Sequence, residues 1–464
     1  MPVCREGGHC VADNDSAMLL GRSGFWRNMQ TLDESGLQKA RLIPVTGIKG
    51  ALDQESRATS ALLAVIKIVP ELAFELLKDM KVPKGTIETY IEPEFKSGTK
   101  KIRPDGLIVI TRGKKEWRAL VEVKTRNNEL DLNQLNAYLD LCRDYKIDAL
   151  ITISNQVLNA SGAHPTEGID QRKLRSTGLL HLSWLKVITD SLVLSEHKGV
   201  EDMERDLVLT ELIRFMQSDA SGASEFNDMG PSWTTIRESV KSGSMKKPDE
   251  ALMETVSRFE SLVRYSALTL SARLGVSAKE IVPRSAKSDY KRHLVSQSQK
   301  LIQSKQLIGS ITIPGAPADL EMSADLGSGL LHCRFTISAP QEGRNKSRIS
   351  WLTRQIKEVP TGTTISWSYK HARIPESPHS HQNLSDKNYE YELDNSRELS
   401  IFTIEVVRNM GTKRSSGKGG FIDSVVGLFE ETYGNLLQNV KPWQPPAPKL
   451  SETVREIIPS NEAP

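Results

Sequence analysis

The sequence has few of the features that mark secreted or membrane-spanning proteins. Its 464 residues include only four cysteines, which are scattered and form no CxxC motif, as is typical of a reducing compartment. The N-terminus carries no basic leader followed by an apolar stretch. The longest apolar run, Ala61–Val69, is too short to cross a bilayer. We therefore expect a cytoplasmic protein without a membrane segment.

A strong excess of charge of one sign is also absent, because the formal net charge is only +3. Hydrophobic residues make up 38% of the chain and charged residues 26%, which fits a globular protein of more than one domain. Composition and patterning divide the chain into five parts. We expect an N-terminal extension (1–45), an α/β domain (46–198), a helical linker domain (199–307), an α+β C-terminal domain (308–442) and a Pro-rich tail (443–464).

The α/β domain is expected to hold a mixed sheet flanked by helices. Helical spacing over Asp53–Asp79 is interrupted at Pro70, and a second helix is expected over Leu130–Tyr145. Four apolar segments have the pattern of strands: Ile87–Phe95, Gly106–Ile110, Ala119–Val123 and Ala149–Ser154. The first three strands are close enough for antiparallel hairpins. The helix before the fourth supplies the crossover that a parallel pair requires. The segment Leu179–Leu194 is expected to add a strand and a helix to the same domain.

The C-terminal half contains strands and helices but no motif that assigns a function. Residues 232–307 have helical spacing, and alternation typical of strands follows over 311–337. Further strands are expected over Thr363–Tyr369 and Leu399–Arg408, with helices over Ser347–Lys357 and Phe421–Leu437. The basic segment Arg344–Arg348 runs into Trp351 and Arg354, and this cluster is compatible with nucleic-acid contact. The alternative is that Trp351, Leu352 and Ile356 form the buried face of a helix. We expect this half to bind a partner protein or a second copy of the chain.

The residues with the clearest chemical pattern are two carboxylates and a lysine. Asp105 begins one predicted strand, and Glu122-Val123-Lys124 ends the next, with sixteen residues between Asp105 and Glu122. Side chains at positions i and i+2 of a strand point to one face, so Glu122 and Lys124 emerge together. A hairpin would bring the Asp105 carboxylate beside Glu122.

Two neighbouring carboxylates repel each other unless a cation lies between them. Oxygen ligands of this kind suit Mg²⁺, with Mn²⁺ as an alternative, and such a metal can polarise a phosphate and activate water. Lys124 would then orient that water or stabilise developing negative charge. The structural alternative is an exposed hairpin with a local ion pair.

Further candidates lie on the two predicted helices. Glu55 shares a helix face with core-directed positions, which favours a third metal ligand; the alternative is that it complements the helix N-terminus. Gln134 and Tyr138 are four residues apart and so project from one face of a helix. We expect these two side chains to contact a phosphate or a base of the substrate. The alternative is that Gln134 is a surface residue beside a half-buried Tyr138 and has no role in binding.

Local charge favours a phosphate-containing partner. Between residues 81 and 126, twelve Lys and Arg stand against six Asp and Glu, a net charge of +6. This segment includes Lys101 and Arg103, which we expect to bind substrate. The alternative is that these basic residues lie in exposed turns, where they keep the sheet soluble and bind no substrate.

Pro104-Asp105, Glu122-Val123-Lys124 and Gln134-xxx-Tyr138, in this order, resemble the PD-(D/E)xK nuclease superfamily and its RecB-like branch. The resemblance covers about residues 45–195 and implies a restriction-endonuclease-like core. It also implies that Asp105, Glu122 and the Val123 carbonyl bind magnesium and that Lys124 is catalytic. A hydrolase that cleaves DNA, in restriction or anti-phage defence, is the expected function. The alternatives are a non-catalytic nucleic-acid-binding protein on the same fold and a structural or interaction protein.

Overall fold

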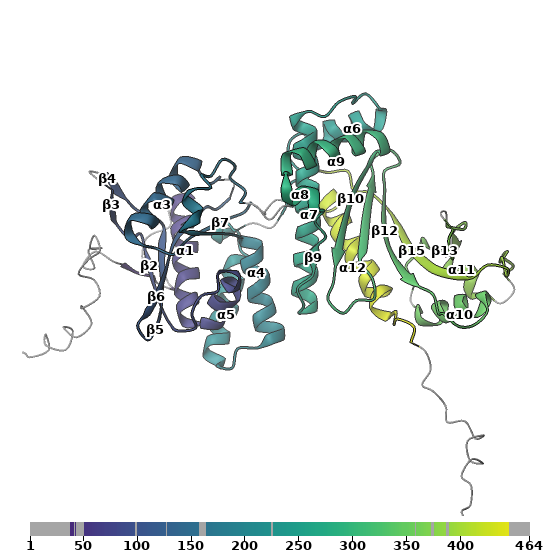
Figure 1. Cartoon of the computed structure of the whole chain (residues 1–464), viewed down its shortest axis with the longest axis horizontal. Coiled ribbons are helices and arrows are strands. Elements are labelled where there is room, and N and C mark those ends of the chain that lie inside the picture. The colour runs from purple at the N-terminus through teal and green to yellow at the C-terminus, as the bar shows by residue number, and fades with distance from the viewer. Residues whose placement is uncertain are drawn as a thin grey trace, which may run out of the picture. The chain divides into compact units, whose positions relative to one another are not determined.

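A computed structural model describes residues 38–40, 42, 51–97, 100–126, 128–156, 164–223, 226–357, 359–372, 375–386 and 389–444. The chain is a mixed α/β protein that divides into two compact units (Figure 1). The first unit contains residues up to 154 together with 166–182 and 207–222, and the second contains 155–165, 183–206 and the chain from 223. The expected N-terminal extension and Pro-rich tail lie almost wholly outside the described residues.

The first unit is built on a mixed sheet in the order β1-β2-β5-β6-β7-β8. Its strands are β1 (Gln38–Lys39), β2 (Thr86–Ile91), β5 (Gly106–Arg112), β6 (Lys115–Val123), β7 (Ala149–Ser154) and β8 (Gly178–Ser183). Strands β2, β5 and β6 pair antiparallel, and β6 and β7 pair parallel, which confirms the expected mixed sheet.

Two helices pack on opposite faces of this sheet. Helix α1 (Ala51–Ile68) comes so close to β5 that a Cβ on Gly106 would stand 2.5 Å from Leu63 Cδ1. Helix α3 (Leu132–Tyr145), capped by the Asp131 side chain, buries leucines against the other face. The short helix α2 (Pro70–Leu76) follows α1 because proline is well suited to the first turn of a new helix.

The segment after β2 differs from the expected strand. Strand β2 ends at Ile91, and the chain then forms a separate two-stranded ladder, β3 (Phe95–Ser97) and β4 (Lys100–Ile102). Phe95 is buried and packs edge-to-face on Tyr145 of α3, with ring centroids 5.0 Å apart. This aromatic contact draws β3 away from the main sheet.

The second unit contains a seven-stranded antiparallel sheet in the order β14-β13-β15-β12-β11-β10-β9. The strands are β9 (Lys279–Glu280), β10 (Gln306–Thr312), β11 (Leu320–Asp325), β12 (Leu330–Ser338), β13 (Thr363–Tyr369), β14 (His379–Ser380) and β15 (Leu399–Asn409). Alternate residues of β12, β13 and β15 are buried, as the sequence pattern predicts for strands with one face on the core.

Helices of the second unit pack against this sheet or against one another. They are α4 (Trp184–Val193), α6 (Trp233–Ser242), α7 (Glu250–Leu274), α8 (Arg284–Ser288), α9 (Tyr290–Ser304), α10 (Asn345–Gln355), α11 (His381–Ser385) and α12 (Phe421–Asn435). Helices α7, α9, α11 and α12 pack against the sheet, whereas α4 and α6 pack on α7, and α8 packs on α9. Residues from α6, α7, α12 and the strands form a single hydrophobic core. The helices of 199–307 therefore share a core with the strands of 308–442, although we expected two domains there.

Two helices lie in a different unit from the one expected. Helix α4 packs against α7 and belongs to the second unit, whereas we expected it to complete the first. The C-terminal part of α5 (Met203–Met216), followed by the turn η6 (Asp219–Ser221), belongs to the first unit. The two units are therefore not consecutive stretches of chain.

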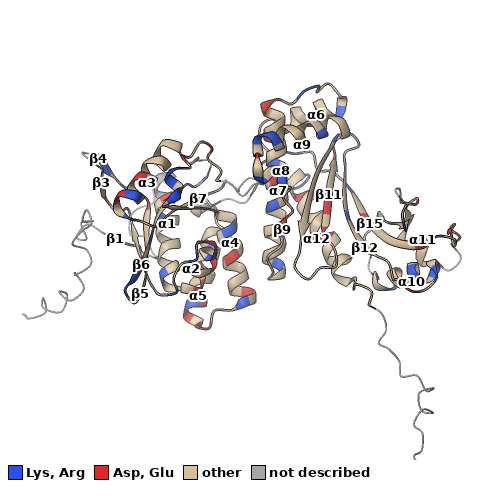
Figure 2. Cartoon of the chain, in the orientation of Figure 1, with Lys and Arg blue, Asp and Glu red and all other residues tan. Residues whose placement is uncertain are grey.

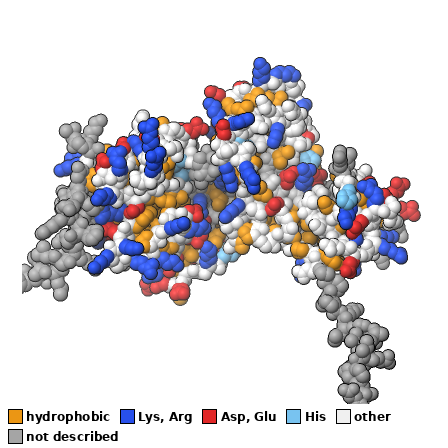
Figure 3. All heavy atoms as spheres, in the orientation of Figure 1, with side chains coloured by type: hydrophobic (Ala, Val, Ile, Leu, Met, Phe, Trp, Pro, Cys, Tyr) orange, Lys and Arg blue, Asp and Glu red, His pale blue; other side chains and the backbone are white. Residues whose placement is uncertain are grey.

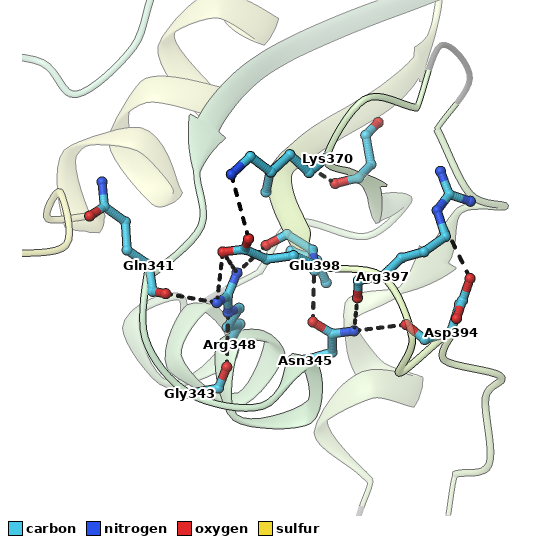
Figure 4. A network of polar contacts seen from close by, with 11 residues as sticks. Gln341, Gly343, Asn345, Arg348, Lys370, Asp394, Arg397 and Glu398 are labelled. Carbon is cyan, nitrogen blue, oxygen red and sulfur yellow. Dashed lines mark hydrogen bonds and ion pairs between the residues drawn. The ribbon is translucent and has the colours of Figure 1, made fainter.

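Helix α10 is fixed to the second unit by buried polar side chains (Figure 4). Arg348 is 5% exposed and donates to the carbonyls of Gly343, Gln341 and Leu399, while its guanidinium also binds the Glu398 carboxylate at 3.1 Å. The guanidinium of Arg348 is therefore bonded within the fold. Leu352 and Ile356 are buried and Trp351 is partly buried, which confirms that they form the inner face of this segment.

Charged side chains of both signs are intermixed on the surface of each unit (Figures 2 and 3). Within the described parts of the chain, no helix is long and apolar enough to cross a membrane.

Candidate active site

The pairing of β5 with β6 places Asp105 and Glu122 next to each other. The last pair in this ladder is Gly106 with Val121, so the next residues on the two chains are Asp105 and Glu122. Residues opposite each other in an antiparallel pair have Cβ atoms about 5 Å apart. Asp105 Oδ2 also accepts a hydrogen bond from the Val123 N–H at 2.7 Å, which fixes the carboxylate at the end of β6.

Lys124 links the carboxylates at this edge of the sheet. Its Nζ donates to Glu122 Oε1 at 2.7 Å, to Glu55 Oε1 at 3.2 Å and to the Val123 carbonyl at 3.0 Å. Glu55 comes from the second turn of α1, and the other two residues come from the end of β6. The structure thus brings together Asp105, Glu122, Lys124 and Glu55, which the sequence singled out; we call these four residues the acidic cluster.

The acidic cluster holds buried carboxylate oxygens that lack a partner. Glu122 is 1% exposed and Glu55 is 8% exposed, and the Oε2 atom of each has no hydrogen bond. Burying a polar atom without a hydrogen bond costs about 1–3 kcal/mol, and more when the group is charged. A site that retains two such atoms is suited to bind a donor or a cation.

The electrostatics of the acidic cluster show an excess of negative charge. Burial raises the pKa of Asp105 to about 8, and the nearby Glu122 and Glu55 carboxylates add to this rise. The Val123 N–H and the Lys124 ammonium oppose it. Burial alone would lower the pKa of Lys124, but Glu122, Asp105 and Glu55 together raise it above its ordinary value. Lys124 therefore stays charged.

Gln134 and Tyr138 face the acidic cluster from helix α3. Gln134 Nε2 donates to the Tyr138 hydroxyl at 2.9 Å, and Tyr138 is 3% exposed. Burial raises the pKa of the Tyr138 hydroxyl, and the negative charges of Glu122 and Asp105 raise it further. Because those charges act on it, the hydroxyl lies near the carboxylates, on the side of the sheet that α3 covers.

Lys101 and Arg103 lie elsewhere, on and just after the small β3–β4 ladder. Lys101 pairs with Glu94 at 2.7 Å, and Arg103 pairs with Glu94 at 3.4 Å and with Glu92 at 3.6 Å. Both basic side chains are exposed. The structure does not bond either of them to the acidic cluster.

No family model, curated protein or solved structure matches this chain. The function has to be argued from the site itself.

Sequence reasoning missed two buried polar residues on the strands that follow β6 in the sheet. The parallel pairing of β6 with β7 puts Thr152 next to Glu122, and Thr152 Oγ1 lies 2.9 Å from Nδ1 of His181 on β8. Both residues are at most 4% exposed. Their positions in apolar strand segments could have been noticed, but only the strand order reveals that Thr152 adjoins Glu122 and that His181 contacts Thr152.

The acidic cluster has donors that suit a hard divalent cation. Among the described residues, no three His, Cys, Asp or Glu side chains already stand as a group that could hold a metal ion. The Lys124 ammonium lies between Glu122 and Glu55, where it neutralises part of their charge. The carboxylate oxygens without partners and the Val123 carbonyl are nevertheless the oxygen donors that Mg²⁺ prefers. Their chemistry fits the metal, provided that Lys124 moves when it binds.

Proposed function

We propose that the first unit is a magnesium-dependent nuclease of the PD-(D/E)xK type that hydrolyses phosphodiester bonds of DNA. The observation that carries the proposal is the pair of buried, unpartnered carboxylate oxygens of Glu122 and Glu55 beside Lys124. The order of elements adds support, because α1, the β2–β5–β6 ladder, α3 and the parallel strand β7 follow the order that this resemblance implies.

Each residue of the acidic cluster has a role in this proposal. Asp105, Glu122 and the Val123 carbonyl would hold Mg²⁺ or Mn²⁺, with Glu55 as an additional ligand. A bound metal of this kind polarises the phosphoryl oxygen and lowers the pKa of a water ligand. Lys124 stays protonated beside the carboxylates, so its role is to orient the attacking water and to stabilise negative charge in the transition state.

The test compares cleavage of single- and double-stranded DNA, with an RNA of the same sequence, in Mg²⁺, Mn²⁺ and a chelator. We expect cleavage of DNA by the wild-type protein that stops when the metal is removed. Lys124→Ala and Asp105→Asn should lower kcat by about 10²–10³-fold, the usual effect of removing a group that stabilises transition-state charge. Lys78→Ala is the matched control, because Lys78 is an exposed lysine of the same unit that pairs with Glu75 and is not bonded to the acidic cluster. Wild-type and Lys124→Ala proteins that cleave equally, or no cleavage in either metal, would refute the proposal.

A second candidate is a nucleic-acid-binding protein without catalytic activity. The observation that favours it is that Lys124 already neutralises part of the charge of Glu122 and Glu55 without a metal. This candidate requires DNA binding that weakens steeply with salt and is unchanged by a chelator. A role in restriction or anti-phage defence follows only by analogy with nucleases that carry a second unit.

A further inference from the structure

The turn that follows Lys124 is held in an unusual backbone conformation. Arg126 has φ +54°, in the left-handed region that residues other than glycine rarely adopt. Its N–H donates to the Gly222 carbonyl at 2.8 Å, and the Asn128 N–H donates to the Thr125 carbonyl at 3.2 Å. Residue 222 lies far along the chain, so a segment from beyond α5 fixes the position of Arg126.

Close packing at Gly222 strengthens this constraint. Gly222 has φ +68°, and a Cβ on it would stand 3.0 Å from Thr125 Cβ and 3.3 Å from Thr125 Oγ1. The two backbones therefore approach each other where a side chain would crowd them. Gly222 adopts its positive φ without strain, whereas Arg126 does not, and strained residues of that kind cluster at functional sites.

The side chain of Arg126 is held as well. Its Nε donates to Oε1 of Gln54, which is 8% exposed. Gln54 precedes Glu55, the residue that binds Lys124. Two consecutive residues of α1 thus hold two cationic side chains of one turn, and the guanidinium of Arg126 lies at the same edge as the acidic cluster. Arg126 as a whole is exposed.

A phosphate backbone that approaches the acidic cluster meets the carboxylates of Glu122 and Glu55, whose negative charge repels it. A guanidinium held beside them offsets this repulsion, and its planar set of N–H donors matches two phosphate oxygens at once. Holding the side chain in advance also lowers the conformational entropy lost on binding.

We propose that Arg126 binds a phosphate of the substrate backbone next to the one that is cleaved, and that Gln54 and Gly222 position it for this contact. This inference rests on the nuclease function proposed above. The competing explanation is that Arg126 only ties the turn to α1.

The experiment measures binding of a labelled DNA oligonucleotide over a range of salt concentrations, with Ca²⁺ in place of Mg²⁺, and cleavage kinetics with Mg²⁺. Arg126→Ala should weaken binding about 10-fold and lower the slope of log K against log salt concentration by about 0.7–0.9, the loss of one phosphate contact. In cleavage, KM should rise by a similar factor while kcat changes little. Arg126→Lys should give intermediate binding with the wild-type slope, because it keeps the charge but not the planar donors.

Two further variants separate phosphate binding from a purely structural role. Arg143→Ala, which removes an exposed arginine at the far end of α3 that is paired with Asp140 and Asp144, should behave as wild type. Gln54→Ala removes the tie to α1 but keeps the cation, so it should weaken binding less than Arg126→Ala and leave the salt slope unchanged. Equal effects of Gln54→Ala and Arg126→Ala, or a wild-type slope in Arg126→Ala, would overturn the inference while cleavage by the wild-type protein still stands. A wild-type protein that neither binds nor cleaves DNA would instead refute the proposed function.

Discussion

Buried charged side chains have more hydrogen-bond partners in the second unit than in the first. In the second unit, Arg348 is 5% exposed and its guanidinium is surrounded by carbonyls and by the Glu398 carboxylate. In the first unit, Glu122 and Glu55 are similarly buried, yet each keeps one carboxylate oxygen without a partner. Burial of a charge is unfavourable unless hydrogen bonds compensate it. The compensated group has a structural explanation, whereas the uncompensated pair points to a ligand.

Asn345 extends the contrast. Its side-chain amide donates to the carbonyls of Asp394 and Arg397 and accepts from the Leu399 N–H, so its donors and acceptor are used within the fold (Figure 4). The basic and amide residues at the start of α10 therefore hold that helix against the strand β15.

The largest effect on stability is expected when Arg348, whose buried charge is compensated by hydrogen bonds, is replaced. Arg348→Ala would leave the carbonyls of Gly343 and Gln341 and the Glu398 carboxylate without their partner. We expect a loss of about 2–3 kcal/mol in the free energy of unfolding, because the buried Leu399 carbonyl also loses its donor and a buried polar group without a hydrogen bond costs about 1–3 kcal/mol. Urea unfolding followed by tryptophan fluorescence measures this loss. Arg344→Ala, at an exposed neighbouring arginine, should change the free energy by less than about 0.5 kcal/mol. Equal stability of the two variants would remove the contrast.

Removing a buried charge from the first unit should change the free energy of unfolding less than Arg348→Ala does. Glu122→Gln removes a buried charge that is only partly paired, and Lys124 keeps its ion pair with Glu55. We expect the free energy of unfolding without metal to stay within about 1 kcal/mol of wild type or to rise. Mg²⁺ should raise the unfolding temperature of the wild-type protein, because a ligand of the native state stabilises it, and should not raise that of the variant. A variant stabilised by Mg²⁺ as much as wild type would show that Glu122 is not a ligand.

The smallest effect is expected at the glycine that supports the turn after Lys124. Gly113 and Gly222 both have positive φ, but a Cβ on Gly113 would meet nothing within 4 Å, whereas one on Gly222 would crowd Thr125. Gly113→Ala should therefore cost about 1 kcal/mol of stability and leave DNA cleavage unchanged. Gly222→Ala should cost slightly more and also raise KM, because the turn that carries Arg126 must shift. Thermal unfolding and cleavage kinetics of both variants measure the difference, and identical kinetics would contradict the role of Gly222.

Much of the local structure could be predicted from periodicity. Strands β7 and β13 have the bounds that the apolar alternation predicts, and α3 begins within two residues of its expected start. The convergence of Asp105, Glu122 and Lys124 was predictable too, because it depends only on a hairpin and on the two-residue repeat of a strand. These features are local or nearly so.

The parts that could not be predicted depend on contacts between distant segments. The order of β6, β7 and β8 places Thr152 beside Glu122 and His181 beside Thr152. Arg126 is held by hydrogen bonds to Gln54 and Gly222, which are 72 and 96 positions away in the sequence. We expect Lys101 and Arg103 to bind substrate because of the positive net charge of their segment. In the structure each forms an ion pair with Glu94, a pairing that the sequence alone does not reveal. Whether these two bind substrate stays a prediction.

The division of the chain between the units has a consequence for how the protein is made. The polypeptide passes from one unit to the other at residues 154, 165, 182, 206 and 222. Leu209, Leu212 and Met216 of α5 are buried, and the Gly222 carbonyl holds the turn after Lys124. During synthesis, the first unit therefore cannot finish folding until residue 222 has left the ribosome, by which time α4 has already emerged. A fragment cut at residue 198, where the sequence suggests a boundary, would lack residues 207–222 of the first unit.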